Sequence, residues 1–289
     1  MPISHDVLIN EIESFENIKL DVDYLCSLKP KMRKMWQSFY ADDVQIDYGT
    51  DDYDLCYLLR YYPSYSEIIE LFFNYWNVSL DRLLNRSCTL NVKIFGGGAC
   101  PELYGLVSYI SNHPEVEDET QVSVEVFDYY LDGWEKARDL TCHMISSHFD
   151  NIDFSCVVSE LDFNEEIDQE ILDNLWGETD IIIFQHFFNE LDLDSSKKNL
   201  EKVLDNITPS SLVLFVERPN YDKCNEVIDF YRNLIISKKG FYREEKGQIT
   251  EINEHIPSKL EGLFDGSSGL ILAKKIDIKV LIASEQRIF

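Results

Sequence analysis

The chain has 289 residues, of which 26 are basic and 53 acidic, so its formal net charge is −27. A charge of this sign repels the phosphate backbone of a nucleic acid, so we expect RNA binding only with the help of a partner, and we favour a basic protein as that partner. Apolar residues make up 45% of the chain and aromatic residues are numerous, which excludes a chain that is disordered throughout.

The cysteine pattern indicates a reducing compartment. The seven cysteines are an odd number and none is arranged as C-x-x-C, so we expect an intracellular protein of the cytoplasm or the nucleus. Residues 1–10 have no basic segment followed by an apolar one, and no stretch approaches the roughly 18 apolar residues of a membrane span. We therefore expect neither secretion nor membrane insertion, and the sequence does not indicate how many copies assemble.

Residues 5 to about 86 are predicted to be helical. Apolar residues recur at helical spacing, as at Ile9, Ile12 and Phe15, and Pro63 ends or bends one of these helices. We expect residues 1–88 to form an N-terminal helical region that caps the rest of the chain.

From residue 89 onward, short apolar runs alternate with amphipathic segments, which is typical of an α/β protein with a mostly parallel sheet. Strands are predicted over residues 90–95, 122–127, 154–159, 180–185 and 211–217, with a closing pair near 247–252 and 269–275. Helices are predicted over residues 101–111, 131–148, 167–176, 195–206 and 222–238. Residues 89–289 are predicted to form one α/β domain.

The first predicted strand breaks into three successive glycines, residues 96–98, and a helix start follows. Pro101 suits the first helical position, because an N–H group at that position would have no partner within the helix and proline lacks one. Glu102 places a carboxylate near the positive end of the helix dipole. Glycine lets the backbone approach a ligand that a side chain would exclude. A strand, a glycine turn and a helix in this order indicate the place where open α/β sheets bind a nucleotide-like ligand.

The second predicted strand leads to an acidic residue that fits the same ligand. Asp128 directly follows residues 122–127 and lies 30 residues after Gly98 (128 − 98). A carboxylate at this strand end accepts the hydroxyl groups of a ribose, and it is expected about 20 residues or somewhat more beyond the glycine turn. The glycine turn and Asp128 together predict a nucleoside site more specifically than either does alone.

Two nucleotide classes fit this site poorly. Pro101 stands where the dinucleotide motif G-x-G-x-x-G has its third glycine, and no G-K-[ST] follows to form a phosphate-binding loop. A nucleoside with an amino-acid tail, the shape of S-adenosylmethionine, fits better. After the third strand, Asp162 would accept from the adenine amino group and Phe163 would cover the ring, although Asp162 is equally consistent with a solvated loop acid.

Three motifs resemble one enzyme family. Residues 94–103, I-F-G-G-G-A-C-P-E-L, resemble the first motif of class I S-adenosylmethionine-dependent methyltransferases, in particular a branch with G-G-G-P-G-S-E-L. Asp128 followed by Trp134 resembles the acidic second motif of that branch, and residues 184–191, F-Q-H-F-F-N-E-L, are similar to its F-x-x-N-E-L motif. The branch includes ribosomal-RNA methyltransferases of the uridine-N3 type. The resemblance implies a Rossmann-like seven-stranded sheet whose last strand is antiparallel.

The candidate site residues follow from these motifs. The expected cofactor-binding residues are Gly96, Gly97, Gly98, Glu102, Asp128, Tyr129, Asp162, Phe163 and Gln185. The expected catalytic residues are His186, Asn189 and Glu190: Asn189 would orient the methyl acceptor, and Glu190 or His186 would accept its proton. The alternatives are a packed, hydrogen-bonded His186 and a helix or turn cap at residues 189–190. No metal is expected, because H-E-x-x-H and paired cysteines are missing.

Three functional hypotheses stay open. The first is a methyltransferase that uses S-adenosylmethionine, with an RNA base presented by a partner, a protein or a small molecule as acceptor. The second, the alternative to the first, is a methyltransferase-like scaffold without catalysis that binds protein partners through its acidic surface and helical cap. It is supported by the strong acidity and by Ala99 and Cys100, which replace the Pro-Gly of the family motif. The third is an NAD-dependent oxidoreductase, which Pro101 disfavours.

Overall fold

The computed structural model describes residues 3–38, 46–50, 52–75, 83–84, 89–114, 116, 120–167, 169, 172–173, 179–206, 211–217, 222–238, 243–249 and 276–283. The helices are α1 (His5–Glu16), α2 (Val22–Ser38), α3 (Tyr53–Arg60), α4 (Tyr62–Tyr75), α6 (Pro101–Ser111), α7 (Leu131–His148), α9 (Leu193–Asn206) and α10 (Asp222–Lys238), with a short 3-10 helix η1 (Phe188–Glu190). The strands are β1 (Thr89–Phe95), β2 (Gln121–Asp128), β3 (Asp153–Glu160), β4 (Ile181–Gln185), β5 (Leu212–Glu217), β6 (Arg243–Ile249) and β7 (Ile276–Ala283).

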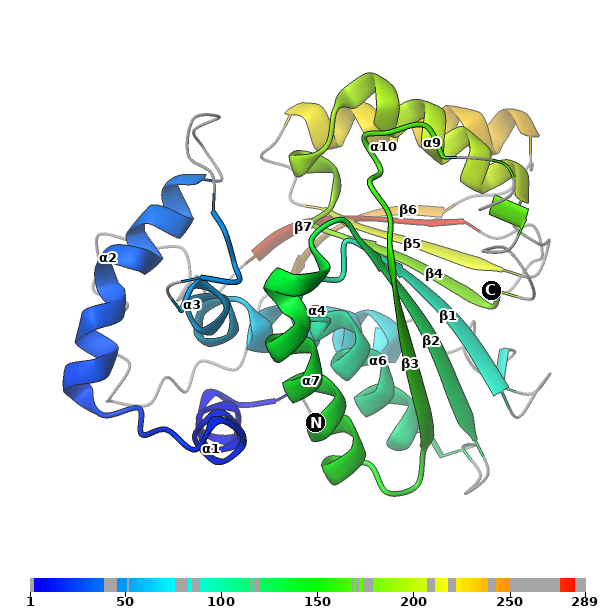
Figure 1. Ribbon diagram of the computed structural model, residues 1–289. Helices are drawn as coiled ribbons and strands as arrows, with labels where there is room; N and C mark the ends of the chain where they lie inside the picture. The colour runs from blue at the N-terminus through cyan, green and yellow to red at the C-terminus, as the bar shows by residue number, and fades with distance from the viewer. Residues whose placement is uncertain are drawn as a thin grey trace.

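The strands lie in one sheet in the order β3-β2-β1-β4-β5-β7-β6 (Figure 1). The first five are parallel, whereas β7 runs antiparallel to its neighbours β5 and β6. The chain builds outward from β1 to β3 and then returns to add β4 on the other side of β1. The prediction of an α/β protein with a mostly parallel sheet is confirmed, and the reversal at β1 and β4 is the kind of switch point where such sheets bind ligands.

The predicted elements agree with the structure where both can be compared. The predicted strands over residues 90–95, 122–127, 154–159, 180–185 and 211–217 match β1 to β5 to within one residue at each end. The strand predicted over 247–252 overlaps β6, and the one over 269–275 lies outside the described residues. The helix predicted over 167–176 lies largely outside them too.

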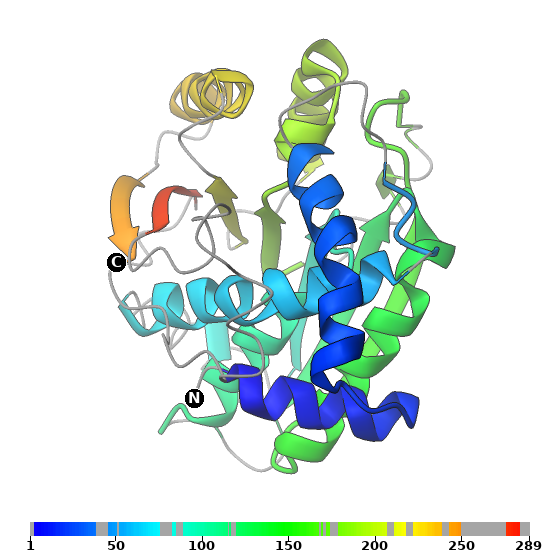
Figure 2. The same ribbon diagram turned by 90° about the vertical axis from the view of Figure 1, so that its left-hand side faces the viewer.

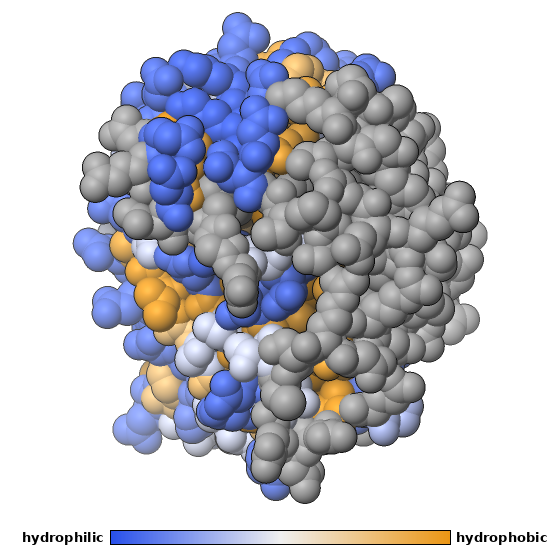
Figure 3. Space-filling view, turned by 90° about the vertical axis from the view of Figure 1, so that its right-hand side faces the viewer, coloured by the Kyte–Doolittle hydropathy of each residue, from blue (hydrophilic) through white to orange (hydrophobic). Residues whose placement is uncertain are grey.

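Helices cover both faces of the sheet, with α4, α6 and α7 on one side and α9 and α10 on the other (Figure 1). Successive strand residues pack against the two helix layers in turn. Ile183 belongs to the buried cluster shared with α6 and α7, and its neighbour Phe184 belongs to the cluster shared with α9 and α10. Hydrophilic side chains gather over the part of the surface where α9 and α10 lie (Figure 3). None of the helices in the described part of the chain is long and apolar enough to cross a membrane.

The N-terminal helices share a core with the sheet layer. Leu8 of α1, Leu59 of α3 and Ile68 of α4 belong to the same buried cluster as strand residues of the sheet. Helix α4 lies so close to α6 that a Cβ on Gly105 would stand 2.1 Å from the carbonyl oxygen of Ser66. Figure 2 shows these helices together in blue and cyan in front of the sheet. This packing brings tyrosines of α3 and α4 to the carboxyl ends of the strands.

Candidate functional site

A cavity of about 490 Å³ opens at the carboxyl ends of β1, β2, β4 and β5. Its walls come from the turns that follow these strands, from the loop after β3 and from the N-terminal region. Nine residues expected from the sequence line it, namely Gly96, Gly98, Asp128, Tyr129, Asp162, Phe163, Gln185, His186 and Glu190. The structure therefore brings the three sequence motifs together in one cavity.

The glycine turn leaves no room for side chains at its two left-handed positions. Gly96 has φ +64°, and a Cβ there would lie 2.2 Å from the ring of Phe187. Gly98 has φ +51°, and its Cβ would lie 3.3 Å from the indole of Trp134. Only glycine adopts such backbone angles without strain, so the turn needs glycine at both positions.

Asp128 joins the glycine turn to the end of β2. Its Oδ2 accepts the backbone N–H of Gly98 at 2.9 Å, and its Oδ1 accepts that of Tyr130 at 2.8 Å. Burial raises the pKa of Asp128, and the two N–H donors oppose this shift. Each carboxylate oxygen has a further acceptor direction, so Asp128 can brace the turn and still accept hydroxyl groups from a ligand in the cavity.

Cys100, which stands where the family motif has a glycine, lies next to the glycine turn. Cys100 has φ +57° and is fully buried, and its Sγ lies 3.8 Å from the carbonyl oxygen of Gly98. Cys100 lines a second cavity with Arg138 and Cys142, and it is absent from the described lining of the first cavity. The substitution at this position therefore leaves the 490 Å³ cavity open.

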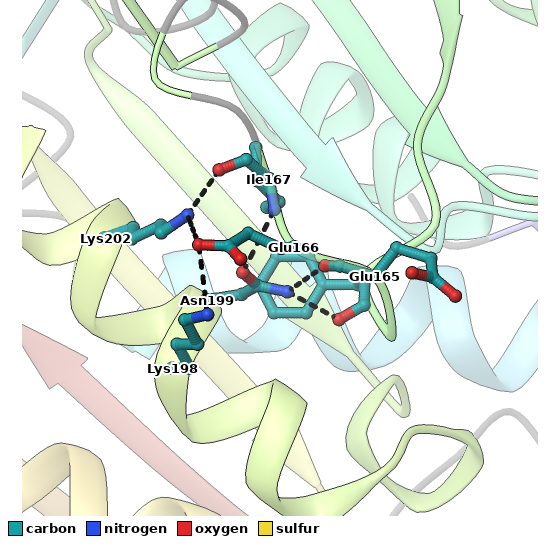
Figure 4. A network of polar contacts seen from close by, with 7 residues as sticks. Glu165, Glu166, Ile167, Lys198, Asn199 and Lys202 are labelled. Atoms are coloured by element: carbon teal, nitrogen blue, oxygen red, sulfur yellow. Dashed lines mark hydrogen bonds and ion pairs between the residues drawn. The ribbon is translucent and has the colours of Figure 1, made fainter.

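The loop after β3, which carries Asp162 and Phe163, is held by helix α9 (Figure 4). Asn199 donates from Nδ2 to the carbonyl oxygens of Phe163 at 2.8 Å and Glu165 at 2.7 Å. Glu166 forms ion pairs with Lys198 and Lys202 of the same helix. Asn199 is 1% exposed, so its side chain lies in the protein interior. Hydrogen bonds in the interior are electrostatically stronger than those at the surface, and these bonds hold the loop in place.

The turn after β4 carries a histidine and is held by a carboxylate from β5. Glu217 is 1% exposed, and its Oε1 accepts the backbone N–H groups of Phe187 at 2.8 Å and Phe188 at 2.9 Å. Its Oε2 lies 3.9 Å from Nδ1 of His186, a residue with φ +53°. The result is a histidine at the cavity wall with a buried carboxylate beside one ring nitrogen.

Aromatic rings from the N-terminal region form the opposite wall. Tyr48 stacks on Trp134 with ring centroids 4.2 Å apart, and Tyr57 meets Trp134 edge-on at 4.8 Å. Tyr65 lies 6.2 Å from Tyr57 and 4.3 Å from the ring of His186. This wall runs without a break from the glycine turn to the histidine.

Three of the expected site residues are placed differently. A Cβ on Gly97 would point inward, 2.8 Å from Val126 and 3.2 Å from Oε1 of Glu102. Glu102 is 3% exposed beneath the glycine turn, where burial raises its pKa to about 8. Neither residue belongs to the described lining of the cavity. Asn189 lies in η1, and its side chain is outside the described part of the structure.

Several lining residues were missed by sequence reasoning. Glu217 is the last residue of a buried strand, and a carboxylate at that point is a signal that the sequence does offer. Tyr48, Tyr57 and Tyr65 reach the cavity only through the packing of the N-terminal region, which no local pattern reveals. Among the described residues, no group of three or more His, Cys, Asp or Glu side chains is arranged to hold a metal ion.

Comparisons with known proteins give a weak likeness. No family model and no curated protein matches the chain. An O-methyltransferase family protein from Burkholderia thailandensis has a TM-score of 0.44 at 10% identity, covering 91% of this chain and 70% of that one. A spermidine synthase in complex with a transition-state analogue has a TM-score of 0.39 at 18% identity (68% and 53% covered). A protein of unknown function from Deinococcus radiodurans also has a TM-score of 0.39, at 14% identity (75% and 87% covered). These TM-scores are below 0.5, so functional assignment rests on the site itself.

Proposed function

We propose that the chain binds S-adenosylmethionine in the 490 Å³ cavity and transfers its methyl group to an acceptor. The observation that carries this proposal is the hydrogen bond between Gly98 and Asp128, which fixes a glycine turn and a strand-end carboxylate beside a cavity at the switch point of the sheet. This arrangement is suited to an amino-acid tail and a ribose lying next to each other.

The lining residues fit the parts of this cofactor. Gly96 and Gly98 line the cavity, and because they carry no side chain the amino-acid tail could approach their backbone closely. Asp128 would accept from the ribose hydroxyls, Tyr129 would flank the ribose, and Asp162 with Phe163 would hold the adenine. Bound there, S-adenosylmethionine supplies an activated methyl group, and the protein orients the acceptor toward it.

The residues after β4 would handle the acceptor's proton. His186 lines the cavity, and the Glu217 carboxylate beside its Nδ1 would orient the ring and stabilise its charged form. His186 would then take the proton of the acceptor as a general base. Glu190, at the rim of the same wall, is placed to hold a charged or polar part of the acceptor.

The finer assignment, to the branch that methylates uridine N3 of ribosomal RNA, rests on the sequence motifs of residues 94–103 and 184–191. The acceptor classes left open by the motifs are an RNA base presented by a partner, a protein and a small molecule. A catalytically inactive scaffold that binds a basic protein is the rival hypothesis, and its support from the motif is weakened because Cys100 does not belong to the described lining of the 490 Å³ cavity.

Calorimetric titration tests the proposal. Purified protein is titrated with S-adenosylmethionine, with S-adenosylhomocysteine and, as a control, with NAD. We expect micromolar binding of the first two ligands and none of NAD. A folded sample that binds none of them would favour the scaffold, and binding of NAD alone would favour an oxidoreductase.

A further inference from the structure

The aromatic wall of the cavity has an unusual chemistry. It consists of Tyr48, Tyr57, Tyr65 and Trp134, and Glu190 lines the same cavity. Burial raises the pKa values of Tyr48 and Tyr57 well above their ordinary range, and the negative charge of Glu190, which lines the same cavity, adds to both shifts. We name these five residues the tyrosine cage.

The Asp, Glu, Lys and Arg residues in the described lining of the cavity are all acidic. The acidic residues of the cavity lining are Asp47, Asp128, Asp162, Glu190 and Glu217. None of the described residues that line the cavity is a lysine or an arginine. A phosphate or carboxylate group entering this space would meet the carboxylates of the described lining, whereas a cation would be attracted both by these charges and by the aromatic rings.

A buried acceptor beside the cage lacks a donor. Gln185 is 7% exposed, and its Nε2 donates to the carbonyl oxygen of Tyr65 at 3.1 Å. Its Oε1 has no hydrogen-bond partner among the described residues, and Gln185 lines the cavity. Leaving a buried amide oxygen without a donor costs about 1 to 3 kcal/mol, so this site is built for a ligand that brings an N–H group.

We propose that the methyl acceptor is an alkylammonium group held by the tyrosine cage and Gln185, an inference that rests on the methyltransferase function proposed above. The aromatic rings and Glu190 would bind the cation, and Gln185 would accept one of its N–H bonds. The net charge of −27 would also draw a cationic acceptor toward the protein.

The reaction balances as an N-methylation. The ammonium group first gives one proton to His186, which leaves a neutral amine with a free electron pair. This pair forms the new N–C bond to the methyl carbon as the C–S bond breaks, and the sulfur keeps the bonding electrons. The products are a methylated ammonium and S-adenosylhomocysteine, and His186 releases its proton to solvent.

The test compares ligands of similar length that carry a positive charge or none. Protein saturated with S-adenosylhomocysteine is titrated with 1,4-diaminobutane and with 1,4-butanediol, and methyl transfer from S-adenosylmethionine to each is followed by mass spectrometry. A lysine-rich peptide and its acetylated form tell a protein-borne amine from a small one, and a uridine-containing oligonucleotide tests the RNA alternative. We expect binding and methylation of the diamine, the free-lysine peptide or both, and of neither neutral control.

Variants locate the effect. Glu190→Gln keeps the shape of the side chain and should raise the KM for the amine by about tenfold while the Kd for S-adenosylmethionine stays unchanged. Glu226→Gln is the matched control, because it removes the same charge from α10, where Glu226 forms an exposed ion pair with Lys197 of α9. The inference is overturned if S-adenosylmethionine binds but amines neither bind nor react, or if the oligonucleotide alone is methylated. Loss of S-adenosylmethionine binding itself would instead overturn the proposed function.

Discussion

Gly98 donates its backbone N–H to Oδ2 of Asp128 at 2.9 Å, across 30 residues of chain, so the carboxylate at the end of β2 holds the turn at the end of β1. Asp128→Ala removes this hydrogen bond and the one to Tyr130. We expect the free energy of unfolding to fall by about 1 to 3 kcal/mol and binding of S-adenosylmethionine to weaken at least tenfold. Urea unfolding and calorimetry measure the two effects, and unchanged binding in a folded variant would remove Asp128 from the site.

Cys100 occupies a backbone conformation that costs an L-residue about 1 to 2 kcal/mol. Cys100→Gly should therefore be more stable than Cys100→Ala by about 1 kcal/mol, since both lose the thiol but only glycine relieves the strain. Cys100→Val should be the least stable, because a β-branched residue fits positive φ worst. Urea unfolding of the three variants gives the order, and equal stabilities would contradict the left-handed conformation.

Glu102 gives stability a pH dependence. Burial raises the pKa of this carboxyl group from 4.5 to about 8, so between these values the folded state holds a proton that the unfolded state releases. Stability should fall as pH rises through this window, by up to about 1.4 kcal/mol per pH unit. Glu102→Gln removes the dependence, so the variant should match the native chain near pH 5 and exceed it near pH 8. Parallel stability profiles in urea unfolding would disprove the shift.

Asn199 is expected to support adenine binding from outside the cavity. Asn199→Asp replaces its two donor contacts with an acceptor facing the carbonyl oxygens of Phe163 and Glu165. Stability should drop by about 2 kcal/mol, and S-adenosylmethionine should bind more weakly because the loop loses its anchor. Asn206→Asp at the end of the same helix is the control, since its Nδ2 contacts only the backbone of Lys202 among the hydrogen bonds described for it. An equal effect of both variants on binding would refute the role of the loop.

His186 is expected to act on the acceptor rather than on the cofactor. His186→Asn suits the positive φ at this position and removes the base. Turnover should fall by about 10² to 10⁴-fold, while the Kd for S-adenosylmethionine should change less than about twofold. Single-turnover assays and calorimetry separate the two quantities. Turnover within a factor of three of the native chain would exclude His186 as the general base.

Much of the fold is encoded in local patterns. The run I-I-I-F of β4 is buried throughout, and the three glycines after β1 mark the turn at which the cavity opens. The residues that face the cavity were harder to predict, because the backbone angles of each residue decide the direction in which it points. Gly96 and Gly98 have positive φ angles and line the cavity, whereas a Cβ on Gly97 between them would point toward Glu102 inside the protein.

The rest of the site depends on contacts between distant segments. Glu217 reaches the turn at His186 because β5 pairs with β4, and the pattern of apolar residues does not predict which strands pair. Tyr48 and Tyr65 come from an N-terminal region whose sequence predicts helices but not the surface on which they pack. Only the tertiary structure shows that these tyrosines form a wall opposite the strand ends.

The most direct test of the central claim is a crystal structure of the protein grown with S-adenosylhomocysteine at a concentration well above its measured Kd. We expect a ligand in the 490 Å³ cavity, with its ribose hydroxyls within hydrogen-bond distance of Asp128 and its adenine against Phe163. A ligand bound elsewhere, or a cavity that stays empty under these conditions, would contradict the assignment.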